Sequence, residues 1–207
     1  MLSDWLSDNN ILNVKEFSEI FLDNNPFEYV YIDNFLREDK FNELYSALKE
    51  EKYFLENSDL FEYFKTEDFK NNKNIIIREF RNFLKSEEFM SFLESIGNFN
   101  LDRSRMSLYS LKFKQNNYLL CNNGFDIKKK LVGFDLNFVD FNDGEGGDFE
   151  LFSLVNEKPF KVVKSISSKK NRFIIFKVNS LKSFYQISEV LCSDKNRDSI
   201  RGGYYDN

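Results

Sequence analysis

The sequence contains no histidine among its 207 residues, although 30% of them are charged. Imidazole is the commonest general acid or base near neutral pH and the commonest protein ligand of catalytic metals. Its absence excludes Ser-His-Asp and Cys-His nucleophilic catalysis, zinc sites that contain histidine, and the metal site built from two histidines and one carboxylate. Any chemistry that this chain performs must therefore use other side chains.

Cysteine is also scarce, and long apolar runs are missing. Cys121 and Cys192 are too few for a disulfide framework or a four-thiolate metal site. No run of about 18 apolar residues is present, as a transmembrane helix would require. Residues 1–5 lack the basic flank and the apolar run of a signal peptide. The sequence thus predicts a cytoplasmic protein with reduced thiols and no membrane contact.

The charges are mixed in sign, and the net charge is −5. Two short basic clusters, residues 128–130 and 169–170, stand beside acidic segments and are typical of solvated turns. A nucleic-acid-binding protein would concentrate positive charge instead. We therefore expect no nucleic-acid partner.

Aromatic residues are abundant, with 25 phenylalanines, and supply the material for one packed domain, residues 1–207. Within residues 1–105 the apolar residues recur mostly at helical spacing, which makes this part the mostly helical support of the domain. One helix is expected over residues 35–48, capped by Asp33 or Asn34, and the helical pattern of residues 80–96 ends at Gly97. A short strand is expected over residues 27–32.

From residue 106 to residue 207 the apolar period changes to two, and turn clusters separate short strands. The expected strands are residues 107–113, 118–121, 131–139, 149–154, 160–163, 173–178, 184–190 and 199–205. About eight strands after a helical half predict an α+β fold, a double-stranded β-helix (jelly roll) whose N-terminal helices pack on one sheet.

Several segments follow one another in the order typical of a known family. They are the strand-to-helix opening at residues 26–36, the strand 118–121, residues 136–138 with the hairpin 146–151, and the strands 171–176, 183–190 and 197–205. In this order they resemble the iron(II)/2-oxoglutarate-dependent oxygenases, in their prolyl-4-hydroxylase-like branch. The resemblance implies the jelly roll, an iron centre and a 2-oxoglutarate site.

The resemblance also implies where the iron ligands would lie. The histidine and aspartate of the family's His-x-Asp motif fall on Asn122 and Gly124, and the distal histidine falls on Tyr185. Asparagine offers a neutral amide, glycine offers no side chain, and a phenol ionises only near pH ~10. We predict that these three are vestigial metal positions, that no catalytic residue remains, that no cofactor is required, and that iron is not expected to bind.

The residues that bind the co-substrate in this family have counterparts in the sequence. The family holds the distal carboxylate of 2-oxoglutarate with a basic residue a dozen positions after the distal histidine, and Arg197 and Ser199 match this residue and its companion hydroxyl. Strand alternation points both to one face, where a guanidinium can clamp a carboxylate. Phe113 takes the place of the family's tyrosine, with Tyr109 as an offset candidate. If a ligand binds, we expect 2-oxoglutarate or a related carboxylate, bound weakly because one such pair contributes only about 1.5–3 kcal/mol.

A carboxylate-rich stretch offers another reading of the site. Its members are Asp135, Asp140, Asp143, Glu145, Asp148 and Glu150. They could hold a calcium ion or act as paired carboxylates on a sugar, but no EF-hand spacing is present. We expect an exposed acidic hairpin.

Three functional hypotheses follow. The leading one is a catalytically silent member of the oxygenase fold that binds a protein partner or a small carboxylate ligand. The second is an enzyme with an atypical metal site around Tyr185, using Asp126, Cys121 or Glu189. The third is an unrelated jelly-roll binding module, in which Asn122, Tyr185 and Arg197 would not meet in one cavity.

Overall fold

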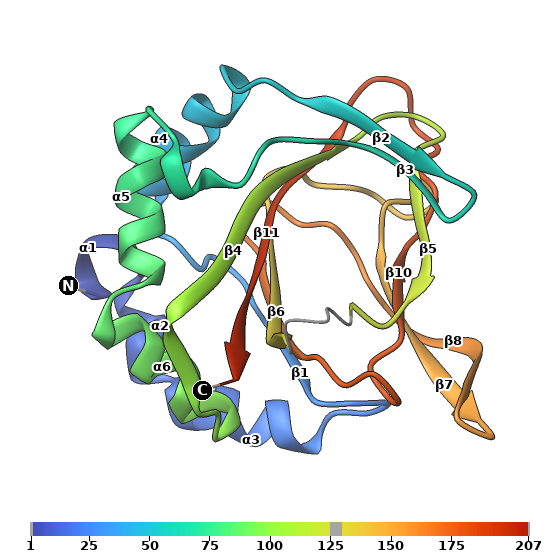
Figure 1. Ribbon diagram of the computed structural model, residues 1–207, viewed down its shortest axis with the longest axis horizontal. Helices are drawn as coiled ribbons and strands as arrows, with labels where there is room; N and C mark the ends of the chain where they lie inside the picture. The colour runs from blue at the N-terminus through green and yellow to red at the C-terminus, as the bar shows by residue number, and fades with distance from the viewer. Residues whose placement is uncertain (1, 125–129, 207) are drawn as a thin grey trace.

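The structure is a computed structural model that describes residues 2–124 and 130–206. Within these residues, 11 strands form one antiparallel sheet that curls on itself, and the helices lie along one side of it (Figure 1). The strands are β1 (Tyr29–Ile32), β2 (Phe54–Ser58), β3 (Phe61–Lys65), β4 (Leu101–Phe113), β5 (Tyr118–Asn122), β6 (Lys130–Asn137), β7 (Phe149–Val155), β8 (Lys158–Ile166), β9 (Phe173–Lys177), β10 (Tyr185–Ile187) and β11 (Arg197–Asp206). This confirms the predicted jelly roll with N-terminal helices.

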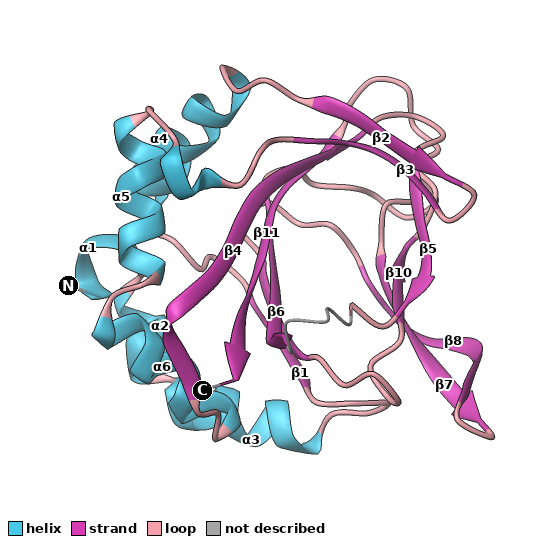
Figure 2. Cartoon of the chain, viewed as in Figure 1, coloured by secondary structure: helices cyan, strands magenta, loops and turns pink. Residues whose placement is uncertain are grey.

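The helices occupy the first half of the chain, which runs from blue to green in Figure 1, and Figure 2 draws them in cyan. They are α1 (Leu2–Trp5), α2 (Asp8–Leu12), α3 (Val14–Asp23), α4 (Glu38–Lys49), α5 (Ile75–Leu84), α6 (Glu87–Gly97) and the 3-10 turn η1 (Phe69–Asn71). Side-chain caps begin three of them: Asp68 accepts a hydrogen bond from Lys70 in η1, Asn74 accepts from the amides of Ile76 and Ile77 in α5, and Ser86 accepts one from Phe89 in α6. Among the described residues, no helix is long and apolar enough to cross a membrane.

The start of α4 differs from the prediction. Neither Asp33 nor Asn34 caps a helix, because α4 begins at Glu38. The side chain of Asn171 holds the intervening backbone extended: it accepts a hydrogen bond from the amide of Leu36 at 2.9 Å and donates one to the carbonyl of Leu36 at 2.8 Å. A contact from the far half of the chain therefore overrides the local helical pattern at residues 34–36.

The mostly helical half also contains a hairpin that the sequence pattern did not predict. Strands β2 and β3 pair with each other, and β3 also pairs with β4 and β5, so that it joins the two sides of the roll. The aromatic residues of β3 are half-buried and belong to the sheet rather than to a helix.

Strand alternation divides the apolar residues into two cores. In β9, Phe173 and Ile175 pack toward the helices, whereas Ile174 and Phe176 point into the roll. The same alternation holds in the neighbouring strands, whose helix-facing residues are Leu108, Val132, Phe134, Leu136, Ile200 and Tyr204. The residues between them therefore face the interior of the roll, where the predicted site lies.

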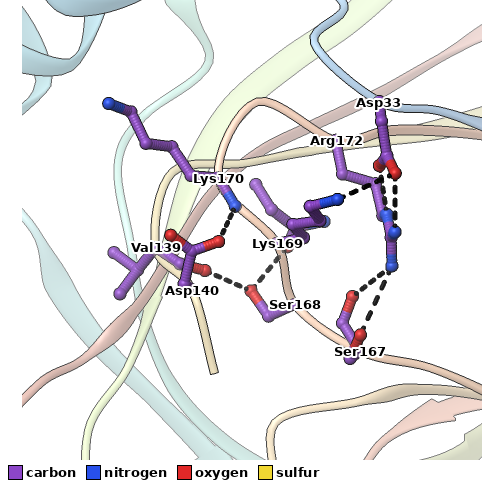
Figure 3. Close-up of polar contacts among 9 residues, drawn as sticks. Asp33, Val139, Asp140, Ser167, Ser168, Lys169, Lys170 and Arg172 are labelled. Atoms are coloured by element: carbon purple, nitrogen blue, oxygen red, sulfur yellow. Dashed lines mark hydrogen bonds and ion pairs between the residues drawn. The ribbon is translucent and has the colours of Figure 1, made fainter. Parts of the chain in front are cut away.

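An ion pair between distant segments joins the chain just after β1 to the loop that precedes β9 (Figure 3). Asp33, just after β1, accepts hydrogen bonds from Nε of Arg172 at 2.6 Å and from its Nη2 at 2.9 Å. Arg172 also donates to the carbonyl of Ser167 at 3.1 Å, and Ser168 donates to the carbonyl of Val139 at 2.9 Å. The loop between β8 and β9 is thus bonded to Asp33 and to Val139, and its own two ends are joined by Arg172 and Ser167.

Candidate functional site

A cavity of about 390 Å³ lies inside the roll, and we call it the roll pocket. Strands β3, β4, β5, β6, β9, β10 and β11 contribute to its wall. Its lining residues are Tyr63, Tyr109, Leu111, Leu119, Asn122, Gly124, Lys130, Gly133, Phe176, Val178, Tyr185, Arg201 and Gly202. The three positions predicted to be vestigial metal positions are therefore brought together in one cavity.

Tyr185 forms one wall of the roll pocket. Its ring stacks on Phe149 with the centroids 4.9 Å apart and meets the edge of Phe176 at the same distance. Only 5% of Tyr185 is exposed, and burial raises the pKa of its phenol above the ordinary value. Near neutral pH the phenol is therefore neutral and donates or accepts hydrogen bonds.

Asn122 and Gly124 shape the backbone opposite Tyr185. The side chain of Asn122 donates to the carbonyls of Leu120 at 3.0 Å and Tyr185 at 3.3 Å, and its oxygen accepts a hydrogen bond from the amide of Gly124 at 3.0 Å. Gly124 has φ +61°, and a β-carbon there would lie 3.0 Å from the phenol oxygen of Tyr185. Glycine at residue 124 and tyrosine at residue 185 thus fit each other sterically.

A buried ion cluster forms the floor of the roll pocket. Asp135 on β6 accepts hydrogen bonds from Nε of Arg201 at 3.0 Å and from Nη2 of Arg197 at 3.4 Å. Burial alone would raise the pKa of Asp135, but the two arginines hold it below its ordinary value. Asp135 is therefore ionised, and the cluster carries two positive charges against one negative charge.

Arg201, which the sequence analysis missed, is the member of this cluster that lines the pocket. Arg197 is fully buried behind it and donates to Ser199 at 3.1 Å, so strand alternation does place these two side chains on one face. Arg201 follows Arg197 by four positions on the same strand, and this even spacing was the signal that could have identified it.

The tyrosines of β3 and β4 complete the polar side of the pocket. Tyr109 stands opposite Arg201 in the register of β4 and β11, and burial raises the pKa of Tyr63 to about 12. Phe113 lies under Arg197, whose guanidinium carbon is 5.6 Å from the ring centroid. The roll pocket thus combines an excess of positive charge with neutral hydroxyl groups, which suits a small anion. Carboxylate binding by Arg197 and Ser199 stays a prediction.

The described residues contain no cluster of metal ligands. Among residues 2–124 and 130–206, no three His, Cys, Asp or Glu side chains lie close enough together to hold one. Glu189 is exposed, and Cys121 alternates with Asn122 along β5, which points the thiol away from the pocket. Asp126 lies outside the described residues. The described side chains therefore do not fit a three-ligand iron site, and we derive no catalytic step through one.

The acidic stretch is not one exposed hairpin. Asp135 is fully buried because it faces the interior of the roll, so its assignment to an exposed hairpin was wrong. Four of the others have separate partners: Asp140 accepts from the amide of Lys170, Glu145 is paired with Lys195, Asp148 accepts from Ser165, and Glu150 accepts from Gln186. These pairings leave no convergent group of carboxylates among the described residues.

Comparisons with known proteins agree with this geometry. Residues 105–205 match the family model described as the 2OG-Fe(II) oxygenase superfamily. The chain is 30% identical over 196 residues to prolyl 3-hydroxylase OGFOD1 of Xenopus laevis, a match that covers 92% of this chain and 37% of that protein. The chain thus spans little more than a third of this curated relative.

Solved structures share the fold. A prolyl hydroxylase from Trichoplax adhaerens, in complex with a peptide fragment of a hypoxia inducible factor, superposes with a TM-score of 0.72 at 11% identity, over 97% of this chain and 94% of that one. A viral collagen prolyl hydroxylase from Paramecium Bursaria Chlorella virus-1, in a 2OG complex, gives a TM-score of 0.57 at 16% identity, over 86% of this chain and 96% of that one. With the family match and the curated relative, the hypothesis of an unrelated jelly-roll module is wrong.

The cofactor prediction has to be corrected as well. We expected no cofactor and did not expect iron, but the matched family is described as 2OG- and Fe(II)-dependent, and a relative is named as a prolyl hydroxylase. That prediction rested on the residues at the three positions Asn122, Gly124 and Tyr185 alone. Iron(II) and 2-oxoglutarate are the cofactors of the family that this chain matches.

Proposed function

Because the chain belongs to the 2OG-Fe(II) oxygenase superfamily, in its prolyl-4-hydroxylase-like branch, we propose that it is a binding member of this family. It takes a small carboxylate of the 2-oxoglutarate class into the roll pocket and serves a protein partner, without hydroxylating that partner. The names of the relatives suggest the class of ligand and of partner. The residues of the roll pocket are the reason to propose binding without turnover.

The observation that carries this proposal is the mutual fit of Gly124 and Tyr185. The phenol lies where a side chain on residue 124 would project, since a β-carbon there would be 3.0 Å from its oxygen. The family that the sequence resembles has the aspartate of its His-x-Asp motif at this position. The described residues of the pocket offer cations, amides and neutral phenols, which orient a carboxylate but include no ionised base that is free to take a proton.

The carboxylate ligand is supported by the charge of the pocket floor. One positive charge of the Arg197–Asp135–Arg201 cluster is not neutralised by Asp135, and Arg201 reaches the cavity. A carboxylate beside Arg201 accepts charge-assisted hydrogen bonds and meets the hydroxyl of Tyr109 on the facing strand. Because Asp135 already binds this guanidinium, we expect a weak complex, with a Kd of about 0.1–1 mM.

The protein partner is supported by strand β8. This strand is one end of the sheet, and it projects from the roll together with β7 (Figure 1). Phe160, Val162 and Val163 on it are 65%, 39% and 46% exposed. An exposed apolar edge strand is a surface on which a partner segment can pair.

The experiment separates binding from turnover. The purified chain is titrated with 2-oxoglutarate by calorimetry, and then incubated with iron(II), 2-oxoglutarate and oxygen while succinate is measured. We expect saturable binding and no succinate above the protein-free control. The variants Arg201→Met and Tyr109→Phe should weaken binding, whereas Arg103→Gln, on the exposed face of β4, should not. Succinate release in proportion to enzyme would overturn the silent role, and the absence of any carboxylate binding would overturn the ligand.

The names of the curated relatives favour a second candidate, an active oxygenase. We place its metal site, of atypical composition, around Tyr185. It predicts a charge-transfer band when iron(II) and 2-oxoglutarate are added without oxygen, and loss of that band in Tyr185→Phe. The cytoplasmic location of the protein stays a prediction.

A further inference from the structure

A second cavity, of about 520 Å³, lies on the outside of the roll between α5, the first half of β4 and the end of β11. Its lining includes Lys70, Arg78, Arg81, Lys85, Arg105 and Asp68. We infer that this cavity, the basic pocket, binds a phosphate-type oxyanion, either free or as the phosphate group of a larger molecule. It shares no lining residue with the roll pocket, so this inference does not depend on the proposed function.

The basic pocket gathers positive charge in a protein whose net charge is −5. Five cationic side chains line it against one carboxylate, that of Asp68. Both oxygens of Asp68 accept hydrogen bonds from backbone amides, those of Lys70 at 2.8 Å and Leu108 at 3.1 Å. Nε of Arg105 lies 3.8 Å from a carboxylate oxygen of Asp102. Asp68 in the lining and Asp102 beside it cannot offset the five cations, and the cavity therefore attracts anions.

Two buried donors in this cavity lack hydrogen-bond partners. Arg81, in the last turn of α5, is only 9% exposed, and its Nη1 has no hydrogen-bond partner among the described residues. The hydroxyl of Ser107 on β4 is also buried and without one. Buried polar groups are nearly always satisfied, and a charged donor is the costliest to leave open. A bound oxyanion that accepts from both groups accounts for this pair.

The frame around these donors is rigid. The hydroxyl of Tyr204 donates to the carbonyl of Leu84 at 2.8 Å, which fastens the end of α5 to β11 just beside Arg81. The guanidinium of Arg105 lies over the ring of Tyr205, 4.7 Å from its centroid. Arg81 and Ser107 therefore stand on elements that are already held together, as a preorganised site requires.

The number and kind of these donors favour phosphate over carboxylate. A carboxylate presents two oxygens and one negative charge, whereas a phosphate group presents three or four oxygens and up to two negative charges. Such an ion can contact Arg81, Ser107 and a further cation such as Arg78 at once. The volume also leaves room beside the phosphate group for the molecule that carries it.

The test uses the whole chain and three probes: inorganic phosphate, pyrophosphate and glycerol 1-phosphate. Amide chemical shifts are followed by NMR at constant ionic strength, with sodium chloride as the reference anion. We expect saturable chemical-shift changes centred on α5 and on residues 104–107. The probe that binds most tightly shows whether the site prefers a free anion or a phosphate ester. Equal shifts with chloride, or shifts spread evenly over all surface lysines and arginines, would mean general screening and overturn the site.

Variants make the test residue-specific. Arg81→Met should weaken binding of the best probe about tenfold or more, because it removes a charge-assisted fork. Arg81 is buried, and this variant can fail to fold. Two variants at exposed arginines, Arg78→Gln and Arg103→Gln, therefore serve as test and matched control. Both variants remove one exposed arginine, but only Arg78 lines the cavity. A loss of about threefold with Arg78→Gln and none with Arg103→Gln is expected, and equal effects of the two would overturn the proposal.

Discussion

Asp135 and Arg201 face each other across β6 and β11, and Nε of the arginine donates to the carboxylate at 3.0 Å. The carboxylate is fully buried and only 6% of the arginine side chain is exposed. Since both residues lie on the interior face of their strands, the roll encloses the pair together with Arg197. The charges of the roll pocket are thus fixed by the fold itself, before any ligand arrives.

Removing the carboxylate from this cluster should destabilise the protein strongly. In Asp135→Asn, two buried guanidinium groups lose their counter-charge, and breaking a buried ion pair in this way costs about 3–5 kcal/mol. The free energy of unfolding, measured with urea, should fall by this amount, while the exposed Asp143→Asn should change it by less than about 0.5 kcal/mol. A loss below about 1 kcal/mol in Asp135→Asn would mean that the cluster is solvated.

The fit between Gly124 and Tyr185 can be separated from ordinary backbone strain. Gly124 and Gly144 both have positive φ, +61° and +84°, but a β-carbon on Gly144 would meet nothing within 4 Å. Gly144→Ala should therefore lose only the backbone term, about 1–2 kcal/mol, and Gly124→Ala should lose more because the methyl group crowds the phenol ring. Urea unfolding of both variants gives the difference. Equal losses would contradict the close contact with Tyr185.

Much of this site could be predicted from the period of the strands. Alternation correctly placed Arg197 and Ser199 on one face, and the order of segments correctly brought Asn122, Gly124 and Tyr185 to one cavity. These features depend on local pattern and on the family's spacing, both of which can be read along the chain.

The rest depended on contacts between distant residues. Asp135 is stabilised by Arg201, 66 residues away, so its burial could not follow from the acidic residues around it. Its position between Phe134 and Leu136 was the local sign of a carboxylate on a buried strand. Likewise, β3 owes its place to pairing with β4 and β5, and residues 34–36 are held by Asn171, so helical propensity in the first half decided neither.

The ion pair of Asp33 should make stability depend on acid pH. The hydrogen bonds from Arg172, above all, hold the pKa of Asp33 below its ordinary value. A carboxyl group whose pKa is lowered by folding stabilises the folded state above its unfolded pKa of about 3.9. This contribution is lost as the pH falls from there through the folded pKa.

The measurement compares Asp33→Asn with the parent protein. The free energy of unfolding is determined by urea at several pH values between about 7 and 3. The variant should be less stable than the parent at neutral pH, and the gap should narrow as the pH falls below about 4. A gap that is constant over the whole range would show that Asp33 contributes through neutral hydrogen bonds only.

Trp5 should report whether the helices and the roll unfold together. It is the only tryptophan, it is 7% exposed, and its ring stacks on Phe83 with the centroids 5.4 Å apart. The helical half is joined to the sheet by the stack of Phe35 on Phe173, at 4.1 Å. If residues 1–207 form one cooperative domain, tryptophan fluorescence and the β-sheet signal in circular dichroism should give the same urea midpoint.

Phe35→Ala, which removes the joining ring, should lower that midpoint for both signals together, with a loss of about 3–5 kcal/mol in the free energy of unfolding. Two separate midpoints in the parent protein would instead mean that the helices around Trp5 unfold independently of the roll.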